Sequence, residues 1–205
     1  MLKSLIFFFF LIPLFSVGQF VDSTKESYKA YFYEDGKISS EGTLRNGKPD
    51  AYWITYYPNG LRKSEGNRKN FLLDSTWLFY KENGNIQYKI NYLENKKNGV
   101  YQHFDENCLL VKEEVFNDDV ISGVTKTFYP DSAEILVKKT IPYENGRREG
   151  VGYEYAKDGR ITAIITYSKN FIVSNEQINK TDKNGLKQGV WKEYFENQRV
   201  KTESR

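Results

Sequence analysis

The sequence is poor in the residues that make disulfides, metal centres and nucleophilic sites. Its 205 residues include one cysteine, Cys108, and one histidine, His103. A single cysteine excludes an internal disulfide, and one cysteine with one histidine cannot supply the usual ligands of a structural zinc ion. We therefore expect no catalytic residue, no metal and no cofactor. Cys108 is expected to be a buried free thiol, and His103 a solvated or cross-strand partner inside a strand.

Charge of one sign is also lacking. Thirty Lys and Arg residues stand against 27 Asp and Glu residues, and the formal net charge is +3. So small a surplus predicts no electrostatic attraction to nucleic acid, and no basic amphipathic helix is present that would suit a membrane surface. The glycines fall at predicted hairpin turns and not between a strand and a helix, which excludes a phosphate-binding loop. We expect no nucleic-acid partner and no membrane binding beyond export.

Long hydrophobic runs are absent except at the N-terminus. Lys3 precedes an apolar run over residues 5–15, which small residues follow. This pattern is typical of a secretory signal peptide, with cleavage after Gly18, and the run is shorter than the roughly 20 residues of a transmembrane helix. We expect residues 1–18 to be the signal peptide and residues 19–27 a linker. The protein would then be exported to the periplasm, cell surface or medium, with an uncleaved anchor as the alternative.

Aromatic residues, in contrast, are abundant. Phe, Trp and Tyr make up 16% of the sequence, and sixteen residues are tyrosines. Aromatic and β-branched residues favour strands, and no stretch shows helical periodicity. The composition predicts an all-β protein.

A repeat of 24 residues runs through the chain. Strings of four residues that end in an aromatic residue begin at positions 53, 77, 101 and 125, in three equal steps. One step back gives a further copy, and two later copies follow after insertions. The last position is aromatic in all seven copies: Phe32, Tyr56, Tyr80, Phe104, Phe128, Tyr155 and Tyr194. Such regularity predicts about seven repeat units over residues 28–205, with an insertion near residues 168–189.

Each unit has the pattern of a β-hairpin. Residues before the turn alternate between two faces, and a second strand of β-branched and aromatic residues follows the turn. Asn-Gly or Asp-Gly pairs, which tolerate positive φ, mark the turns at Gly36, Gly60, Gly84 and Gly159. Cys108 and Ser132 stand where two units lack this glycine, and looser or different turns are expected there. The predicted fold is an elongated, twisted antiparallel sheet of tandem hairpins.

The alternation gives the two faces of each unit different predicted roles. The face of Tyr56 also carries Tyr52, four residues earlier, and we expect this side to form the core, with the repeated rings stacked into a spine. The opposite face carries a large aromatic residue in four units: Trp53, Trp77, Tyr101 and Trp191. These four side chains are either cross-strand packing residues or a binding surface.

Three segments resemble the MORN repeat variant. They are residues 184–197, NGLKQGVWKEYFEN, residues 51–60, AYWITYYPNG, and residues 98–104, NGVYQHF. The likeness spans roughly residues 28–199. The resemblance implies successive hairpins in one elongated sheet and roles in assembly or binding, with no set of catalytic residues. Some bacterial members are labelled as antitoxins of toxin–antitoxin pairs.

The leading functional prediction is an exported, non-catalytic module of the cell envelope that binds another protein or acts as a scaffold. Carbohydrate binding is the alternative, because surface Trp and Tyr side chains can stack on the sugar rings of a cell-wall or other glycan. An antitoxin-like protein that neutralises a partner is the second alternative. The acidic pairs at residues 113–114 and 118–119 lack the spacing of a calcium loop and predict a solvated, charged edge.

Overall fold

The computed structural model describes residues 26–132, 134–194 and 200–204. These residues form strands, turns and loops, and none of them lies in a helix that could cross a membrane. The signal peptide predicted for residues 1–18 lies outside the described residues, as does most of the linker predicted for residues 19–27. The first strand begins at Glu26, two residues before the predicted start of the repeats.

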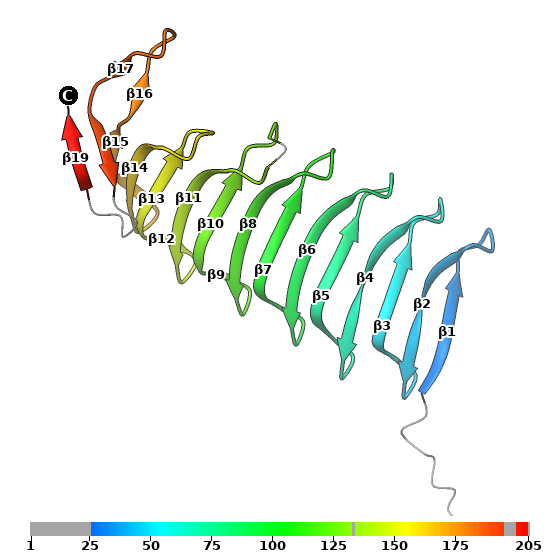
Figure 1. The fold of residues 1–205 in the computed structure, drawn as a ribbon. Coiled ribbons are helices and arrows are strands. Elements are labelled where there is room, and N and C mark those ends of the chain that lie inside the picture. Colours follow the sequence, from blue (N-terminus) through cyan, green and yellow to red (C-terminus); the bar gives the residue numbers. More distant parts are fainter. Residues whose placement is uncertain (1–25, 133, 195–199, 205) are drawn as a thin grey trace, which may run out of the picture.

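Fifteen strands form one antiparallel sheet in the order of the chain, which confirms the predicted fold class (Figure 1). Figure 1 shows a single, elongated and gradually twisting row of strands that is open at both ends. Its strands are β1 (Glu26–Phe32), β2 (Ile38–Arg45), β3 (Lys48–Tyr56), β4 (Arg62–Lys69), β5 (Leu72–Tyr80), β6 (Ile86–Leu93), β7 (Lys96–Phe104), β8 (Leu110–Asn117), β9 (Val120–Ile121), β10 (Gly123–Phe128), β11 (Val137–Glu144), β12 (Arg147–Arg148), β13 (Gly150–Tyr155), β14 (Ile161–Ser168) and β15 (Phe171–Gln177). The short strands β9 and β12 pair with β8 and β11.

The repeated aromatic residue occupies one structural position in every unit. Each of the seven is the last residue of the first strand of its hairpin, and each pairs across a shift in register. The seven pairs are Phe32 with Ile38, Tyr56 with Arg62, Tyr80 with Ile86, Phe104 with Leu110, Phe128 with Val137, Tyr155 with Ile161, and Tyr194 with Val200. The sequence period therefore corresponds to a structural period.

The turn glycines adopt the backbone that the sequence requires of them. Gly36, Gly60, Gly84 and Gly159 have φ values of 83°, 87°, 86° and 84°. In the first hairpin the Gly36 N–H donates to the Tyr33 carbonyl at 3.0 Å, and the Tyr33 N–H donates to the Lys37 carbonyl at 2.8 Å. This is a three-residue loop whose last residue is left-handed, a common hairpin connection.

Cys108 departs from two predictions. It keeps the same loop, because its φ is 61° and its N–H donates to the Asp105 carbonyl at 3.3 Å, although a side chain makes this conformation costly. Its thiol is exposed and not buried, since a residue at the tip of a hairpin has nothing packed over it. At Ser132 a different turn does form, because the Tyr129 N–H reaches forward to the Leu136 carbonyl at 3.0 Å across a longer loop.

Two-residue turns join one unit to the next. Both residues of each turn have positive φ, as a tight hairpin of the mirror-image type requires. The six pairs are Asn46-Gly47, Asn70-Phe71, Glu94-Asn95, Asp118-Asp119, Asn145-Gly146 and Lys169-Asn170. Positive φ returns four residues after each of the first five turns, at Ala51, Ser75, Gly99, Gly123 and Gly150. Each of these five turns is therefore followed, four residues later, by a second left-handed residue.

The main core lies on the face of the tryptophans, which corrects the face assignment made from the sequence. Trp53 is 6% exposed and Trp77 is 3% exposed, and they pack with Leu44, Leu73, Phe79 and Tyr92. Two of the residues expected in the core, Tyr28 and Tyr52, are instead 69% and 51% exposed. Glycine allows the tryptophan side to close, because Gly42 lies opposite Trp53 and Gly66 opposite Trp77, where a Cβ would overlap each indole.

The repeated aromatic rings do not stack into the spine expected from the sequence. Among residues 26–132, 134–194 and 200–204, no ring pair joins two of the seven stripe positions. Equivalent positions in neighbouring hairpins lie two strands apart, about 9.5 Å, whereas paired rings lie about 4.5–7 Å apart. The period is therefore too long for direct ring contact between units.

A second, smaller core closes the last part of the sheet. Ala163, Ile165 and Tyr167 of β14 are buried, and Ile141 of β11 packs against them. Gly152 stands between these strands, and a Cβ there would approach Tyr167. The same device of a glycine under a large ring therefore recurs at both ends of the molecule.

The seventh unit is separate from the long sheet. Among the described residues, strands β18 (Trp191–Tyr194) and β19 (Val200–Ser204) pair only with each other, so the last hairpin is not part of the long sheet. The predicted insertion contributes β15, which pairs with β14. It also contributes a small hairpin of β16 (Lys180–Thr181) and β17 (Lys187–Gln188). The insertion takes the place that the seventh unit would fill, because β15 already occupies the edge of β14.

The packing of Trp77 on Gly66 makes a testable prediction. In a strand interior, Gly→Ala ordinarily stabilises by about 0.5–1 kcal/mol. Here we expect Gly66→Ala to lower the free energy of unfolding in urea by about 1–3 kcal/mol, because the added methyl group overlaps the indole. The cost should shrink in a Trp77→Leu background, where the indole is gone. Equal stability of Gly66→Ala and the wild type would contradict this packing.

Candidate functional site

The four aromatic residues proposed as a binding surface are not an open platform. Trp53 and Trp77 belong to the main core and cannot be reached by a ligand. Tyr101 is half-buried between Tyr88 and Phe116, with ring centroids 5.6 and 6.0 Å away. Burial, and then the neighbouring Tyr88, raises the pKa of Tyr101 to about 12. Of the two roles that the sequence leaves open for these residues, the structure thus shows packing for Trp53 and Trp77.

Trp191, the fourth of these residues, is half-buried and covered by cations. The guanidinium of Arg160 lies 5.2 Å from the ring centroid, and the ammonium of Lys187 lies 4.4 Å from it. Cations over an indole face are attracted by the ring quadrupole and occupy the surface on which a sugar would stack. Trp191 therefore serves the junction between β14 and the last hairpin.

The tyrosines of the stripe bind carboxylates on the preceding unit. Tyr56 donates its hydroxyl to Glu41 at 2.6 Å, and Tyr80 donates to Glu65 at 2.5 Å. Burial together with these hydrogen bonds raises the pKa of both tyrosines to about 12. The hydroxyl of each ring thus bridges the distance between units that the ring itself cannot span.

Glu65 is the most enclosed carboxylate of this ladder. It is 5% exposed, accepts the hydroxyls of Tyr80 and Tyr52, and pairs with the Arg62 guanidinium at 2.9 Å. Burial acts to raise its pKa, but the two hydroxyls and Arg62 outweigh burial, so the pKa of Glu65 is lowered. Because this charge is buried, removing one of its partners would leave it poorly compensated and would be costly.

A second set of tyrosines ties neighbouring turns together. The hydroxyl of Tyr33 donates to the Tyr56 carbonyl at 2.6 Å, and that of Tyr57 donates to the Tyr80 carbonyl at 2.8 Å. Tyr129 makes the same bond to the Tyr155 carbonyl at 2.7 Å. Each bond joins one unit to the next at the same place. The hydroxyls therefore hold the stack in register along this edge.

The face of the stripe also carries an exposed apolar strip, which we call the valine strip. It consists of the exposed Val100, Val124 and Val151 and the half-buried Val115 and Pro142. Val100 pairs with Val115, and Val124 pairs with Pro142, across neighbouring strands. Gly123 lies beside Val115 and Gly150 beside Pro142, where a Cβ would meet the neighbouring side chain at 3.7 and 3.5 Å. The valine strip crosses β7, β8, β10, β11 and β13.

Proline fits this strip because the hydrogen-bond ladder is interrupted beside it. Pro142 lies in an inner strand, β11, where a missing N–H would normally be costly. The paired residues of β11 and β13 are only Lys139 with Glu154 and Thr140 with Tyr153, and the Pro142 carbonyl accepts the Glu149 N–H at 3.2 Å. The bulge at Gly150 therefore removes the need for a donor at residue 142.

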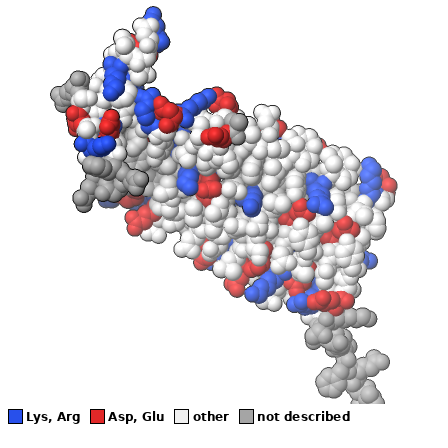
Figure 2. All heavy atoms as spheres, in the orientation of Figure 1, with Lys and Arg blue, Asp and Glu red and all other residues white. Residues whose placement is uncertain are grey.

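The valine strip has a polar border. On the same face Gln102 donates to Glu113 at 3.0 Å, and Lys126 pairs with Glu113 at 3.4 Å. The side of the molecule shown in Figure 2 carries scattered charges separated by wide uncharged areas. An exposed apolar centre with a border of paired polar groups is the usual composition of a protein–protein interface.

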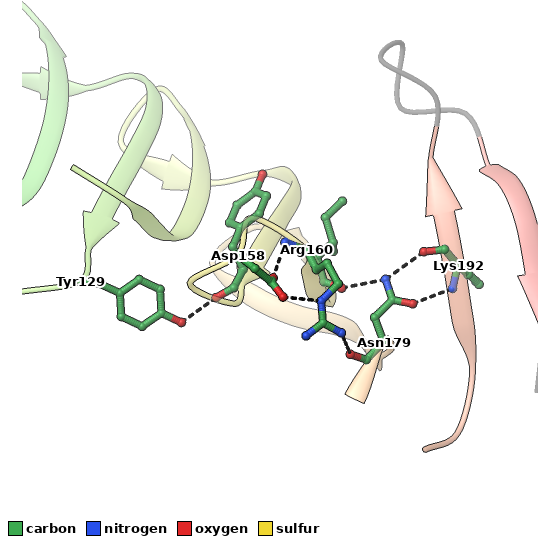
Figure 3. A network of polar contacts seen from close by, with 7 residues as sticks. Tyr129, Asp158, Arg160, Asn179 and Lys192 are labelled. Carbon is green, nitrogen blue, oxygen red and sulfur yellow. Dashed lines mark hydrogen bonds and ion pairs between the residues drawn. The ribbon is translucent and has the colours of Figure 1, made fainter. Parts of the chain in front are cut away.

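The junction with the last hairpin forms the clearest polar network (Figure 3). The Asn179 amide nitrogen donates to the carbonyls of Ile161 and Lys192 at 2.9 and 2.8 Å, and its oxygen accepts the Lys192 N–H at 2.6 Å. Arg160 donates to Asp158 at 2.7 Å and to the Asn179 carbonyl at 3.2 Å. The Asn179 side chain thus replaces the backbone pairing that would otherwise link β14 to β18.

A cavity of about 390 Å³ lies beside this network, lined by Arg160, Ile161, Asn179, Trp191 and Tyr194 among others. The Trp191 Nε1 and Tyr194 hydroxyl are buried without a partner among the described residues. The three hydrogen bonds of the Asn179 side chain are all made with backbone atoms. The network therefore acts as a mechanical clamp between two sheets.

The remaining titratable groups are dispersed. His103 lies opposite Tyr88, with ring centroids 5.0 Å apart, so it is a cross-strand partner. Glu114 pairs with Lys112 at 2.8 Å, and Asp119 accepts the Lys97 N–H at 2.8 Å. Within the described part of the chain, no three His, Cys, Asp or Glu side chains gather closely enough to hold a metal ion.

The hairpin of β5 and β6 decides the kind of repeat. The family model of the MORN repeat variant matches residues 73–94. Residues 73–94 therefore match a MORN repeat variant. A search of curated proteins finds no match to the chain. The MORN segment contains Trp77 and Tyr80, and its neighbours share its strand lengths, turns and register shifts. MORN repeats build a fold that is typically non-catalytic.

Sequence reasoning missed the valine strip. It placed Val100, Val124 and Val151, which stand four residues before Phe104, Phe128 and Tyr155, in the core. It made no prediction for Val115 and Pro142. The signal was present: Val100 and Val115 stand at matched places on either side of a hairpin turn, as do Val124 and Pro142. Alternation does not say which face is buried. The structure shows that the tryptophan face forms the main core, and the valine strip lies on the other face.

The lowered pKa of Glu65 predicts how stability depends on pH. A carboxylate with a depressed pKa contributes stability above its unfolded value, about 4.3, and loses it as the pH falls through the folded value. We expect Glu65→Gln to cost about 1–3 kcal/mol at pH 7, because a charged acceptor of three donors is lost. Urea unfolding should show this difference shrinking below about pH 4. Glu82→Gln, at an exposed turn, is the control, and an equal difference at pH 3 and pH 7 would contradict the assignment.

Proposed function

We propose that this protein is an exported, non-catalytic repeat protein of the cell envelope that binds another protein through the valine strip. The strip supports this most strongly. Val100, Val124 and Val151 are 36%, 43% and 44% exposed, they lie on one face, and no described residue covers them. Contiguous exposed apolar side chains bordered by polar groups are typical of protein interaction sites.

Export is supported by the N-terminal sequence. A lysine, an apolar run over residues 5–15 and small residues up to Gly18 form the pattern that secretion machinery cleaves. Extracytoplasmic chains often rely on disulfides, but here the ladder of tyrosines and carboxylates supplies ties between units. A chain with one cysteine can therefore be stable in an oxidising compartment without an internal disulfide.

A non-catalytic role is supported by the chemistry of the side chains. His103 is paired with a ring, Cys108 lies alone at a hairpin tip, and the buried carboxylate Glu65 is used by Tyr80, Tyr52 and Arg62. A catalytic site needs a nucleophile or base beside an orienting group and a place for substrate. Glycan binding by surface rings has less support, since the four candidate rings are buried or covered.

The test compares matched lysine substitutions at one repeat position. Val124→Lys places a charge in the valine strip, whereas Thr76→Lys places it at the equivalent exposed position two units earlier. We expect Val124→Lys to lower partner recovery from envelope extracts about tenfold, because an apolar interface would have to bury an ammonium. Thr76→Lys should leave recovery unchanged.

Both variants should keep the urea midpoint of the wild type, since surface changes are usually within about 0.5 kcal/mol. Site-specific photo-crosslinking from residue 124 should trap the same partner, while residue 76 should not. Equal recovery by Val124→Lys and the wild type would overturn the proposal. So would cell fractionation that finds no protein lacking residues 1–18 outside the cytoplasm.

A further inference from the structure

Among the described residues, none pairs with the outer edge of the first strand of the sheet. The strand order begins at β1, which pairs only with β2. Its aromatic residues Tyr28, Tyr31 and Phe32 are all exposed, and Phe32 is 60% exposed although its equivalents in the later units are half-buried or buried. Natural proteins blunt such edges with proline, charge or a covering segment. The strand β1 has one lysine, one glutamate and no proline.

The sequence of this edge is nearly symmetric about its alanine. Residues 28–32 read Tyr-Lys-Ala-Tyr-Phe, with an aromatic residue two places before and two places after Ala30. In an antiparallel pair of two such strands centred on Ala30, Tyr28 of one copy lies opposite Phe32 of the other. Lys29 then lies opposite Tyr31. Each of these contacts occurs twice, as a two-fold axis requires.

The faces of the strand agree with this pairing. In later units the equivalents of Tyr28 and Phe32 are Tyr52 and Tyr80, and both donate a hydroxyl to Glu65. Tyr28 and Phe32 therefore share one face of β1. The other face carries Tyr31, which lies 6.4 Å from Trp53 by ring centroids, and Lys29, whose ammonium lies 5.9 Å from the Tyr31 ring. A two-fold axis perpendicular to the sheet preserves these faces in the second copy. Aromatic pairs would therefore meet on one side and cations would meet rings on the other.

We propose that two copies of this chain pair through their β1 strands, antiparallel and centred on Ala30, to form one continuous sheet. The interface is self-complementary and closes after two copies. The opposite end of the sheet offers no equivalent symmetry, because β15 has its exposed apolar residues at one end, Phe171 to Val173, and polar residues at the other. Pairing of β1 with β15 would instead produce open filaments.

Dimerisation would have a consequence for binding. The two-fold axis places both valine strips on the same side of the joined sheet, at positions related by symmetry. A partner with two sites, or an array of partners, would then be held at both, and binding becomes tighter without new contacts. This consequence rests on the proposed function, whereas the pairing of β1 does not.

Disulfide trapping tests the register directly. In a Cys108→Ser background, Ala30→Cys places two thiols opposite each other on the two-fold axis. Directly opposed residues of antiparallel strands have Cα atoms about 4.5–5.5 Å apart, which a disulfide can span. Mild oxidation of purified Ala30→Cys should convert most of the chain to a cross-linked dimer. Tyr28→Cys and Phe32→Cys should each fail to cross-link alone, because identical residues would lie about 14 Å apart, but their mixture should cross-link.

A second measurement does not depend on cysteine geometry. Sedimentation of the wild type should show a reversible dimer. The double variant Tyr28→Lys/Phe32→Lys should sediment as a monomer, with the circular dichroism of the sheet unchanged. Cross-linking of Ala30→Cys no greater than that of Thr202→Cys, on the other exposed hairpin, would overturn the proposal. So would filaments, or protection of β1 by the chain's own N-terminal segment in a monomer. Val124→Lys should leave the cross-linking intact, so failure of partner binding and failure of pairing are distinguishable.

Discussion

A sheet without a second layer has to bury its large side chains against its own backbone, and the rest of this structure depends on that constraint. Trp53 and Trp77 achieve it by leaning over Gly42 and Gly66 on the neighbouring strands. The bulges after each unit-joining turn shift the register beside these rings, and Leu44 and Leu73 pack against them. Most of the apolar side chains that can be covered lie on this face. The other face is left to polar ladders and to solvent.

The opposite face solves a different problem, which is how to connect units whose equivalent residues lie about 9.5 Å apart. Hydroxyls of Tyr56 and Tyr80 reach carboxylates across this spacing, and the hydroxyls of Tyr33 and Tyr57 reach backbone carbonyls of the next unit. In repeat proteins, stability is approximately a sum of units and of interfaces between neighbours. Here the interfaces are largely tyrosine hydrogen bonds. In the later units Val100, Val124 and Val151 stand at the position that Tyr52 holds earlier, and the face is apolar and exposed there.

Much of the fold could be predicted from the sequence, because the period is written in residues that serve local geometry. The seven aromatic positions end seven strands, and Gly36, Gly60, Gly84 and Gly159 take the positive φ expected of them. The buried face could not be predicted from alternation alone, since alternation separates two faces without saying which is covered. Gly42 and Gly66, inside strands, were the missing signal, because a glycine there marks the close approach of a large ring. The separate seventh hairpin depends on Asn179, whose side chain makes hydrogen bonds to the backbone of Ile161 and Lys192. No local sequence pattern predicts that role.

The central claim is that the core lies on the tryptophan face and that the tyrosine and valine face is open. Hydroxyl-radical footprinting of the folded protein, read by mass spectrometry at single residues, tests it most directly. The account predicts rapid oxidation of Tyr28 and Tyr52 and protection of Trp53 and Trp77 until the protein unfolds. Oxidation of the two tryptophans as fast as Tyr28, or protection of the tyrosines in the folded monomer, would contradict it.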